Sequence, residues 1–107
     1  MQTERIGILL REIAMSEYFT VETERTDDPD TMELITNHTL VREGEEFYAT
    51  PEEGEVGSPL AQTVFFGVEG VRALRISGDS LFVTREATFP WESIIDDVRD
   101  ALRDFFL

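Results

Sequence analysis

The 107-residue sequence contains no cysteine and no lysine, and it has only one histidine. Without cysteine these residues offer no disulfide, no thiolate nucleophile and no thiolate ligand for zinc or an iron–sulfur cluster. Without lysine there is no Walker-type phosphate site. A Ser-His-acid triad would depend on His38 alone, and its neighbours Thr36, Asn37 and Thr39 are typical of a strand end. We therefore interpret His38 as structural and predict that the protein is not an enzyme.

Positive charge is also scarce. The sequence has nine arginines and 23 aspartates and glutamates, so the formal net charge is −14. Such a surface repels phosphate backbones and anionic lipid headgroups, which predicts no nucleic-acid partner and no membrane partner. The sequence also has no apolar run of the roughly 18 residues that a membrane span needs, and its first residues lack the features of a signal peptide. We expect a soluble, cytoplasmic protein.

Apolar residues make up 41% of the sequence, enough for the core of one domain. Residues 1–16 are expected to form a helical extension, because Ile6, Leu9, Leu10 and Ile13 fall on one face of a helix over residues 3–15. The domain itself is predicted over residues 17–107.

The first half of this domain has the pattern of a hairpin. Alternating residues from about 19 to 24 predict a half-buried strand, residues 27–30 predict a turn, and residues 31–35 predict the return strand. Residues 42–57 are rich in charge and glycine and predict a connecting loop, with Phe47 and Tyr48 packed against the core.

The second half repeats the plan of two strands and a helix. Ser58 and Pro59 predict the start of a helix, and residues 71–76 and 81–84 predict two strands around a tight turn. Residues 90–107 predict an amphipathic helix with Trp91 and Ile95 on its buried stripe. One member of each pair Phe65-Phe66 and Phe105-Phe106 is expected to be exposed. The predicted fold class is α+β, in two layers: a four-stranded, mostly antiparallel sheet packed by two helices (ββαββα), plus the N-terminal helical extension.

Acidic residues offer few candidates for a site. Asp27, Asp28 and Asp30 lack the spacing of a calcium loop, so a solvated turn is favoured over a metal site. Glu69 lies between Val68 and the following glycine; it caps a turn, which is the favoured interpretation, or projects toward a partner. We predict no metal and no cofactor.

Several short segments occur in the order that one known family shows. They are Thr26 to Met32, Ser58 to Ala61, Val68 to Val71, Leu81 to Thr84, and Trp91. With them the chain resembles, from about Tyr18 to Phe106, the N-terminal domain of the Nfu/NifU iron–sulfur scaffold proteins. The hairpin turn of that family commonly reads Thr-Pro-Asn-Pro-x-Thr-Leu-Lys-Phe. Here Thr26, Pro29 and Thr31 match, whereas Asp27, Asp28 and Glu33 stand where Pro, Asn and Lys are usual.

The resemblance implies an α+β fold and an association with iron–sulfur cluster assembly. In the full-length scaffolds a Cys-x-x-Cys pair in a separate C-terminal domain holds the cluster, so we expect a stand-alone domain, without that Cys-x-x-Cys domain, that does not itself ligate a cluster. The predicted function is a non-catalytic scaffold or accessory module that binds a protein partner, either an iron–sulfur assembly protein or another basic protein. A monomer is favoured. The expected contact residues are Thr26, Asp28, Pro29, Thr31, Glu69 and Gly70.

A second interpretation remains open. The acidic turn at 27–30 and the loop at 42–57 together could bind a small ligand or a metal ion through their carboxylates.

Overall fold

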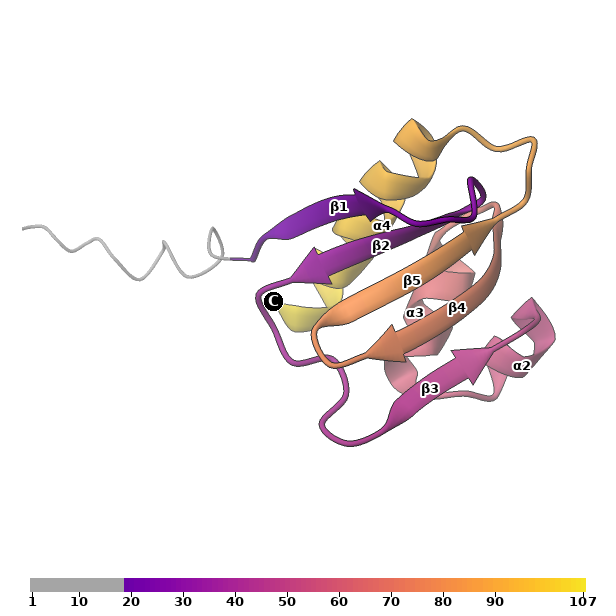
Figure 1. Ribbon diagram of the computed structural model, residues 1–107. Helices are drawn as coiled ribbons and strands as arrows, with labels where there is room; N and C mark the ends of the chain where they lie inside the picture. Colours follow the sequence, from indigo (N-terminus) through magenta and orange to yellow (C-terminus); the bar gives the residue numbers. More distant parts are fainter. Residues whose placement is uncertain (1–18) are drawn as a thin grey trace, which may run out of the picture.

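An antiparallel sheet of five strands forms one layer of the structure, and helices form the other (Figure 1). The computed structural model describes residues 19–107, so the helix predicted over residues 3–15 lies outside the described residues. The α+β class is confirmed. The strands follow the order β1-β2-β5-β4-β3 across the sheet, with β1 at Val21–Arg25, β2 at Thr31–Thr36, β3 at Glu45–Tyr48, β4 at Val71–Ser77 and β5 at Ser80–Arg85.

Two hairpins build most of this sheet, and both were predicted from the sequence. β1 pairs with β2 across the turn at 26–30, and β4 pairs with β5 across a two-residue turn. Gly78 has a φ of +60° in the second turn, a conformation that a residue without a Cβ adopts at little cost. β2 and β5 lie side by side in the middle of the sheet, so each hairpin contributes one central strand.

The predicted loop at 42–57 is wrong in part, because it contains a fifth strand and a short helix. β3 pairs with β4, placing Phe47 opposite Arg75, and α2 spans Pro51–Glu55. β3 has only four residues, two of them glutamates, so it is stabilised chiefly by pairing with the free edge of β4. No local sequence pattern predicts this pairing. Tyr48 packs against the core as predicted, but Phe47 points to the other side of the sheet and is 63% exposed.

The core lies between the sheet and two helices, α3 at Pro59–Gly67 and α4 at Trp91–Phe106. The Ser58 hydroxyl accepts a hydrogen bond from the Ala61 amide at 3.2 Å, which caps α3 where it was predicted to begin. In α4 the fully buried residues are Ile94, Val98 and Leu102.

The prediction of Trp91 and Ile95 on the buried stripe of α4 is correct in part: Trp91 packs against the core, but both side chains are only half-buried. The three buried residues form a narrow stripe at spacings of four, and Trp91 and Ile95 flank it. The prediction for the phenylalanine pairs is confirmed: Phe66 is 68% and Phe105 40% exposed, while their neighbours pack against the core.

His38 packs between aromatic rings at the end of the sheet opposite the β1–β2 turn. Its ring centroid lies 5.1 Å from that of Phe19 and 4.8 Å from that of Phe106, and its Nδ1 lies 3.0 Å from the Asn37 Oδ1. These contacts agree with the structural interpretation of His38.

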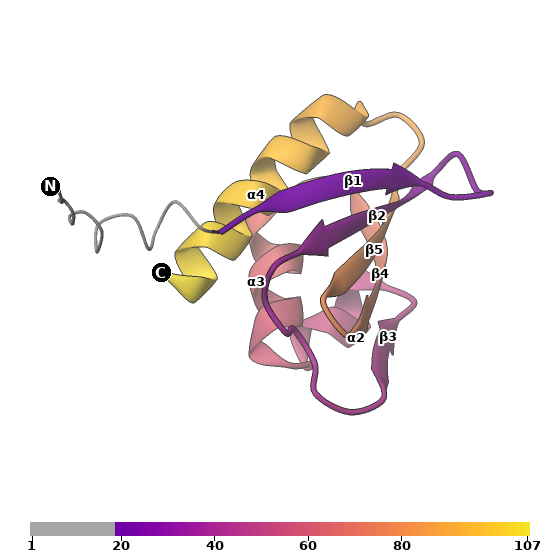
Figure 2. The same ribbon diagram turned by 60° about the vertical axis from the view of Figure 1, so that its left-hand side comes forward.

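α3 and α4 cover only one face of the sheet (Figures 1 and 2). Because side chains alternate along a strand, the other face carries the residues between the buried ones. We call this the open face. Its side chains are Glu22 and Glu24 of β1, Thr31, Glu33 and Ile35 of β2, Ser80, Phe82 and Thr84 of β5, Ala73, Arg75 and Ser77 of β4, and Glu45 and Phe47 of β3.

Candidate functional site

The turn between β1 and β2 is built around the side chain of Asp28. Its Oδ1 accepts a hydrogen bond from the Asp30 amide at 2.9 Å, and its Oδ2 accepts one from the Thr31 hydroxyl at 3.0 Å. The Thr31 amide donates to the Asp28 carbonyl oxygen at 3.0 Å. The Thr26 hydroxyl accepts from the Asp28 amide at 3.2 Å and lies 2.8 Å from the Thr31 carbonyl oxygen. Side chains and backbone therefore fix the same turn.

These hydrogen bonds also set the charge of the turn. The Asp30 amide and then the Thr31 hydroxyl lower the pKa of the Asp28 carboxyl, and the positive charge of Arg72 acts in the same direction. Since the Thr31 hydroxyl proton is directed to Asp28, the Thr84 hydroxyl donates to Thr31 across the 2.8 Å that separate the two oxygens. These contacts favour the charged form of the Asp28 carboxyl and tie its position to β5.

Arg85, the last residue of β5, joins this turn to the start of α4. Its Nε donates to the Asp30 Oδ1 at 3.1 Å, and its Nη1 donates to the Phe89 carbonyl oxygen at 3.1 Å. Its guanidinium carbon lies 4.9 Å from the centroid of the Trp91 ring, close enough for a cation–π interaction. The Trp91 indole in turn donates to the Pro29 carbonyl oxygen at 3.2 Å. Turn, strand end and helix start form one connected unit.

A pocket of about 430 Å³ lies within this unit. That volume falls in the range of roughly 300–1,000 Å³ that is typical of ligand pockets. Its wall combines two guanidinium groups, two carboxylates, an indole and a thioether; the lining residues are Arg25, Thr26, Asp27, Asp28, Pro29, Thr31, Met32, Arg85 and Trp91. The pocket can therefore take a side chain with a charged end and an apolar stem.

The junction of α3 and β4 lies at the same end of the sheet. Gly70 has a φ of +91°, and a Cβ atom there would lie 2.6 Å from Cγ of Phe89. The Glu86 amide donates to the Gly70 carbonyl oxygen at 2.7 Å. Glu69 is exposed, and within residues 19–107 its side chain makes no hydrogen bond or ion pair, so it does not cap the turn as the favoured interpretation had it.

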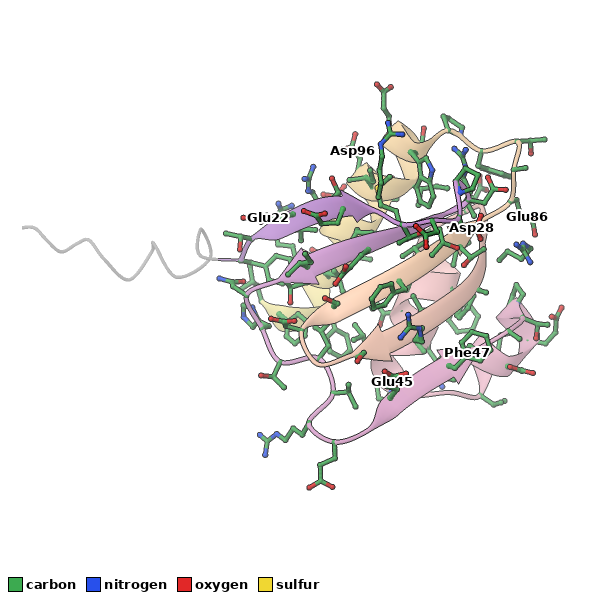
Figure 3. All side chains as sticks on the ribbon, in the orientation of Figure 1. Glu22, Asp28, Glu45, Phe47, Glu86 and Asp96 are labelled. Carbon is green, nitrogen blue, oxygen red and sulfur yellow. The ribbon has the colours of Figure 1, made fainter. Side chains whose placement is uncertain are left out.

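The six predicted contact residues thus lie at one end of the sheet, where the β1–β2 turn and the start of β4 meet. We call these six residues the docking edge: Thr26, Asp28, Pro29, Thr31, Glu69 and Gly70. Figure 3 shows Asp28 and Glu86 at this end. Phe89 links the β1–β2 turn to the α3–β4 junction, because its carbonyl oxygen accepts a hydrogen bond from Arg85 and its ring packs on Gly70.

Sequence reasoning did not assign Arg25, Arg85 and Trp91 to this region, although all three line the pocket. The sequence offered one signal for this region, the single tryptophan at the start of a helix, because its indole N–H needs a hydrogen-bond partner.

In residues 19–107 the placement of potential metal ligands and the length of the helices bear on metal binding and on membrane insertion. Among residues 19–107, no three His, Cys, Asp or Glu side chains are gathered as a metal-binding group. The acidic turn belongs to β1 and β2, whereas the 42–57 segment lies along β3 at the opposite edge of the sheet, so the two parts of the small-ligand hypothesis are not brought together. No helix in that described part is long and apolar enough to cross a membrane.

Fold and site define a small α+β domain with a pocket at one end of its antiparallel sheet. Residues 21–107 match the family described as "Scaffold protein Nfu/NifU N terminal". The chain therefore belongs to the Nfu/NifU N-terminal domain family, a domain associated with iron–sulfur cluster scaffolds. Because the 107 residues contain no cysteine, they hold no cluster through thiolate ligands.

Two curated relatives place this domain within longer proteins. The chain is 28% identical over 86 residues to the "NFU1 iron-sulfur cluster scaffold homolog, mitochondrial" of Drosophila persimilis, an alignment that covers 80% of this chain and 30% of that protein. It is 33% identical over 78 residues to the uncharacterized protein YpgR of Bacillus subtilis, covering 73% of this chain and 20% of the relative. The chain thus spans about a third or less of the length of these relatives.

Two solved structures share the fold. The NifU-like protein of Saccharomyces cerevisiae superposes with a TM-score of 0.70 at 18% identity, covering 96% of this chain and 87% of that one. Protein SAV1430 of Staphylococcus aureus superposes with a TM-score of 0.60 at 18% identity, covering 77% of this chain and 96% of the other.

Proposed function

We propose that this domain is a non-catalytic protein-binding module of iron–sulfur cluster assembly, and that it binds its partner through the docking edge. Family membership supports the association with cluster assembly. The observation that carries the binding role is the connected unit of the Asp28 turn, Arg85 and Trp91, which surrounds the pocket. Such a fixed surface lowers the entropic cost of association, since little has to be ordered when the partner binds.

Two arginines balance two aspartates in the pocket wall, and it is the exposed carboxylates of this edge that favour a basic partner. Asp27 and Glu69 expose carboxylates on either side, and Asp28 adds a third whose charged form is favoured. Within the pocket an arginine or lysine of the partner would place its apolar stem along Trp91 and Met32 and its charged end toward Asp27. The partner then supplies the thiolates for the cluster, and this chain supplies the surface that positions it.

Affinity capture with the full chain from the native lysate, at low and at high ionic strength, tests the proposal. The test variant is Asp27→Asn with Asp28→Asn, in which the amide oxygen of residue 28 can still accept from the Asp30 amide. The control is Asp97→Asn with Asp104→Asn, which removes the same charge from exposed positions of α4.

We expect an iron–sulfur assembly protein or another basic protein to be recovered at low ionic strength, and several-fold less of it with the test variant, in line with the loss of charges from an interface rim. Equal recovery by the test variant and the wild type would contradict the proposal. So would a stoichiometric coloured iron centre formed by the purified chain with ferrous iron and sulfide.

A further inference from the structure

The open face is a second surface with a distinct pattern of charge and apolar groups. Strand register arranges its side chains in rows that cross the sheet. One row reads Glu24, Glu33, Phe82, Arg75 and Phe47, and the next reads Glu22, Ile35, Ser80, Ser77 and Glu45. Carboxylates therefore lie on both edge strands, and the two apolar side chains Ile35 and Phe82 lie between them together with polar residues. Figure 3 shows Glu45 and Phe47 on β3 and Glu22 on β1, at opposite edges of the sheet.

The centre of this face carries two large apolar side chains, Ile35 and Phe82, among polar neighbours, and a cation covers the Phe82 ring. The guanidinium carbon of Arg75 lies 4.0 Å from the centroid of Phe82. The same guanidinium lies 3.5 Å from the Glu45 carboxylate, and Ser77 donates to that carboxylate at 3.1 Å. Phe47 remains 63% exposed beside this group. Phe47 is therefore an exposed aromatic side chain on the same face as Phe82 and Ile35.

Charge decides which occupant suits the open face. It carries four glutamates and one arginine, and that arginine is paired with one of them. A second copy of this chain would place carboxylates against carboxylates, which is unfavourable. Residues 1–18 carry three glutamates and two arginines, so this segment of the chain does not complement the face either.

We infer that the open face binds an amphipathic helix of another protein, with an apolar stripe flanked by arginine or lysine. Four inter-strand spacings of about 4.8 Å give the sheet a width of roughly 19 Å, which a helix of about 13 residues spans. The stripe would contact Ile35, Phe82 and Phe47, and the basic flanks would reach the glutamates of β1 and β3. The open face shares Thr31 with the docking edge, and this inference requires none of the other docking-edge residues.

A photo-cross-linking experiment on the full chain tests this assignment. Phe47 is replaced by the photoreactive benzoylphenylalanine, the chain is irradiated in native lysate, and the cross-linked segment is mapped by mass spectrometry. We expect a foreign segment of positive net charge with apolar residues at helical spacing. Cross-links to residues 1–18, to a second copy, or to an acidic or neutral segment would overturn the inference, and so would the absence of any cross-link.

Variants then test the contacts, with the mapped segment used as a synthetic peptide. Phe47→Ser should weaken its binding by about tenfold or more, as expected for an aromatic anchor. Glu22→Gln with Glu24→Gln should weaken it by roughly threefold or more and reduce its salt dependence, whereas the control Asp97→Asn with Asp104→Asn should leave it unchanged. Equal effects of the two charge variants would overturn the inference.

One further variant distinguishes binding at the open face from binding at the docking edge. Asp28→Asn should leave the cross-link at position 47 intact. If Asp28→Asn abolishes it, the docking edge holds this partner, which overturns the open-face assignment and leaves the proposed function standing.

Discussion

Gly70→Ala should destabilise the domain through two separate effects at the docking edge. The φ of +91° places residue 70 in a region that disfavours residues with a Cβ, at a cost of about 1–2 kcal/mol. The new Cβ would also lie 2.6 Å from Cγ of Phe89, and such overpacking costs about 1–3 kcal/mol. Together we expect a loss of roughly 2–5 kcal/mol in the free energy of unfolding.

Gly78→Ala is the matched control, because residue 78 has a φ of +60° but nothing within 4 Å of a Cβ atom. It should cost only about 1–2 kcal/mol. Both variants gain the same small stabilisation from a stiffer unfolded chain, which cancels in the comparison. Urea unfolding followed by circular dichroism measures both. If Gly70→Ala costs no more than Gly78→Ala, the packing of Phe89 on residue 70 is not as described here.

The remaining predictions concern the same unit. Trp91→Ala should cost about 1–2.5 kcal/mol, because Trp91 is only half-buried, whereas Leu102→Ala at a fully buried position should cost about 2–5 kcal/mol; similar losses would show that the tryptophan belongs to the core. Arg85→Met should cost about 1.5–3 kcal/mol in urea unfolding, and much of this should vanish in an Asp30→Asn background, since the two side chains are paired. The lowered pKa of Asp28 stabilises the folded state at neutral pH, and this contribution is lost as the pH falls from about 4 through the lowered pKa. Asp28→Asn should therefore lose less stability than the wild type on acidification. An unchanged dependence of stability on pH would refute this.

The elements that were predicted correctly carry their own local signals. Ser58 followed by proline indicates a capped helix start, and the alternation around Gly78 indicates a hairpin. α2 was missed although it has a local signal: the Thr50 hydroxyl accepts from the Glu53 amide at 3.2 Å, and the Glu53 carboxylate accepts from the Ala49 amide at 2.8 Å. β3 was missed because a four-residue strand depends on its neighbour β4. Phe47 shows the same limit, since its side of the sheet is set by pairing with Arg75 and not by its hydrophobicity.

Of the candidate site, only the β1–β2 turn could be predicted from the sequence. The Thr26 to Thr31 segment is recognisable because short polar side chains bond to their own turn. The contributions of Arg85 and Trp91 depend on contacts across more than 50 residues of sequence, which only the fold brings about. The role expected of Trp91 as a core residue follows from helical periodicity, which gives the direction of a side chain but not where the sheet beneath it ends.

We propose that this domain acts by binding a protein partner at the docking edge. The most direct measurement is a titration of the full, isotopically labelled chain with the captured partner, followed through amide chemical shifts. We expect shifts of the amides of residues 26–28, 30, 31, 69 and 70 that saturate with the partner. Unchanged shifts at these residues when the partner is saturating would contradict it.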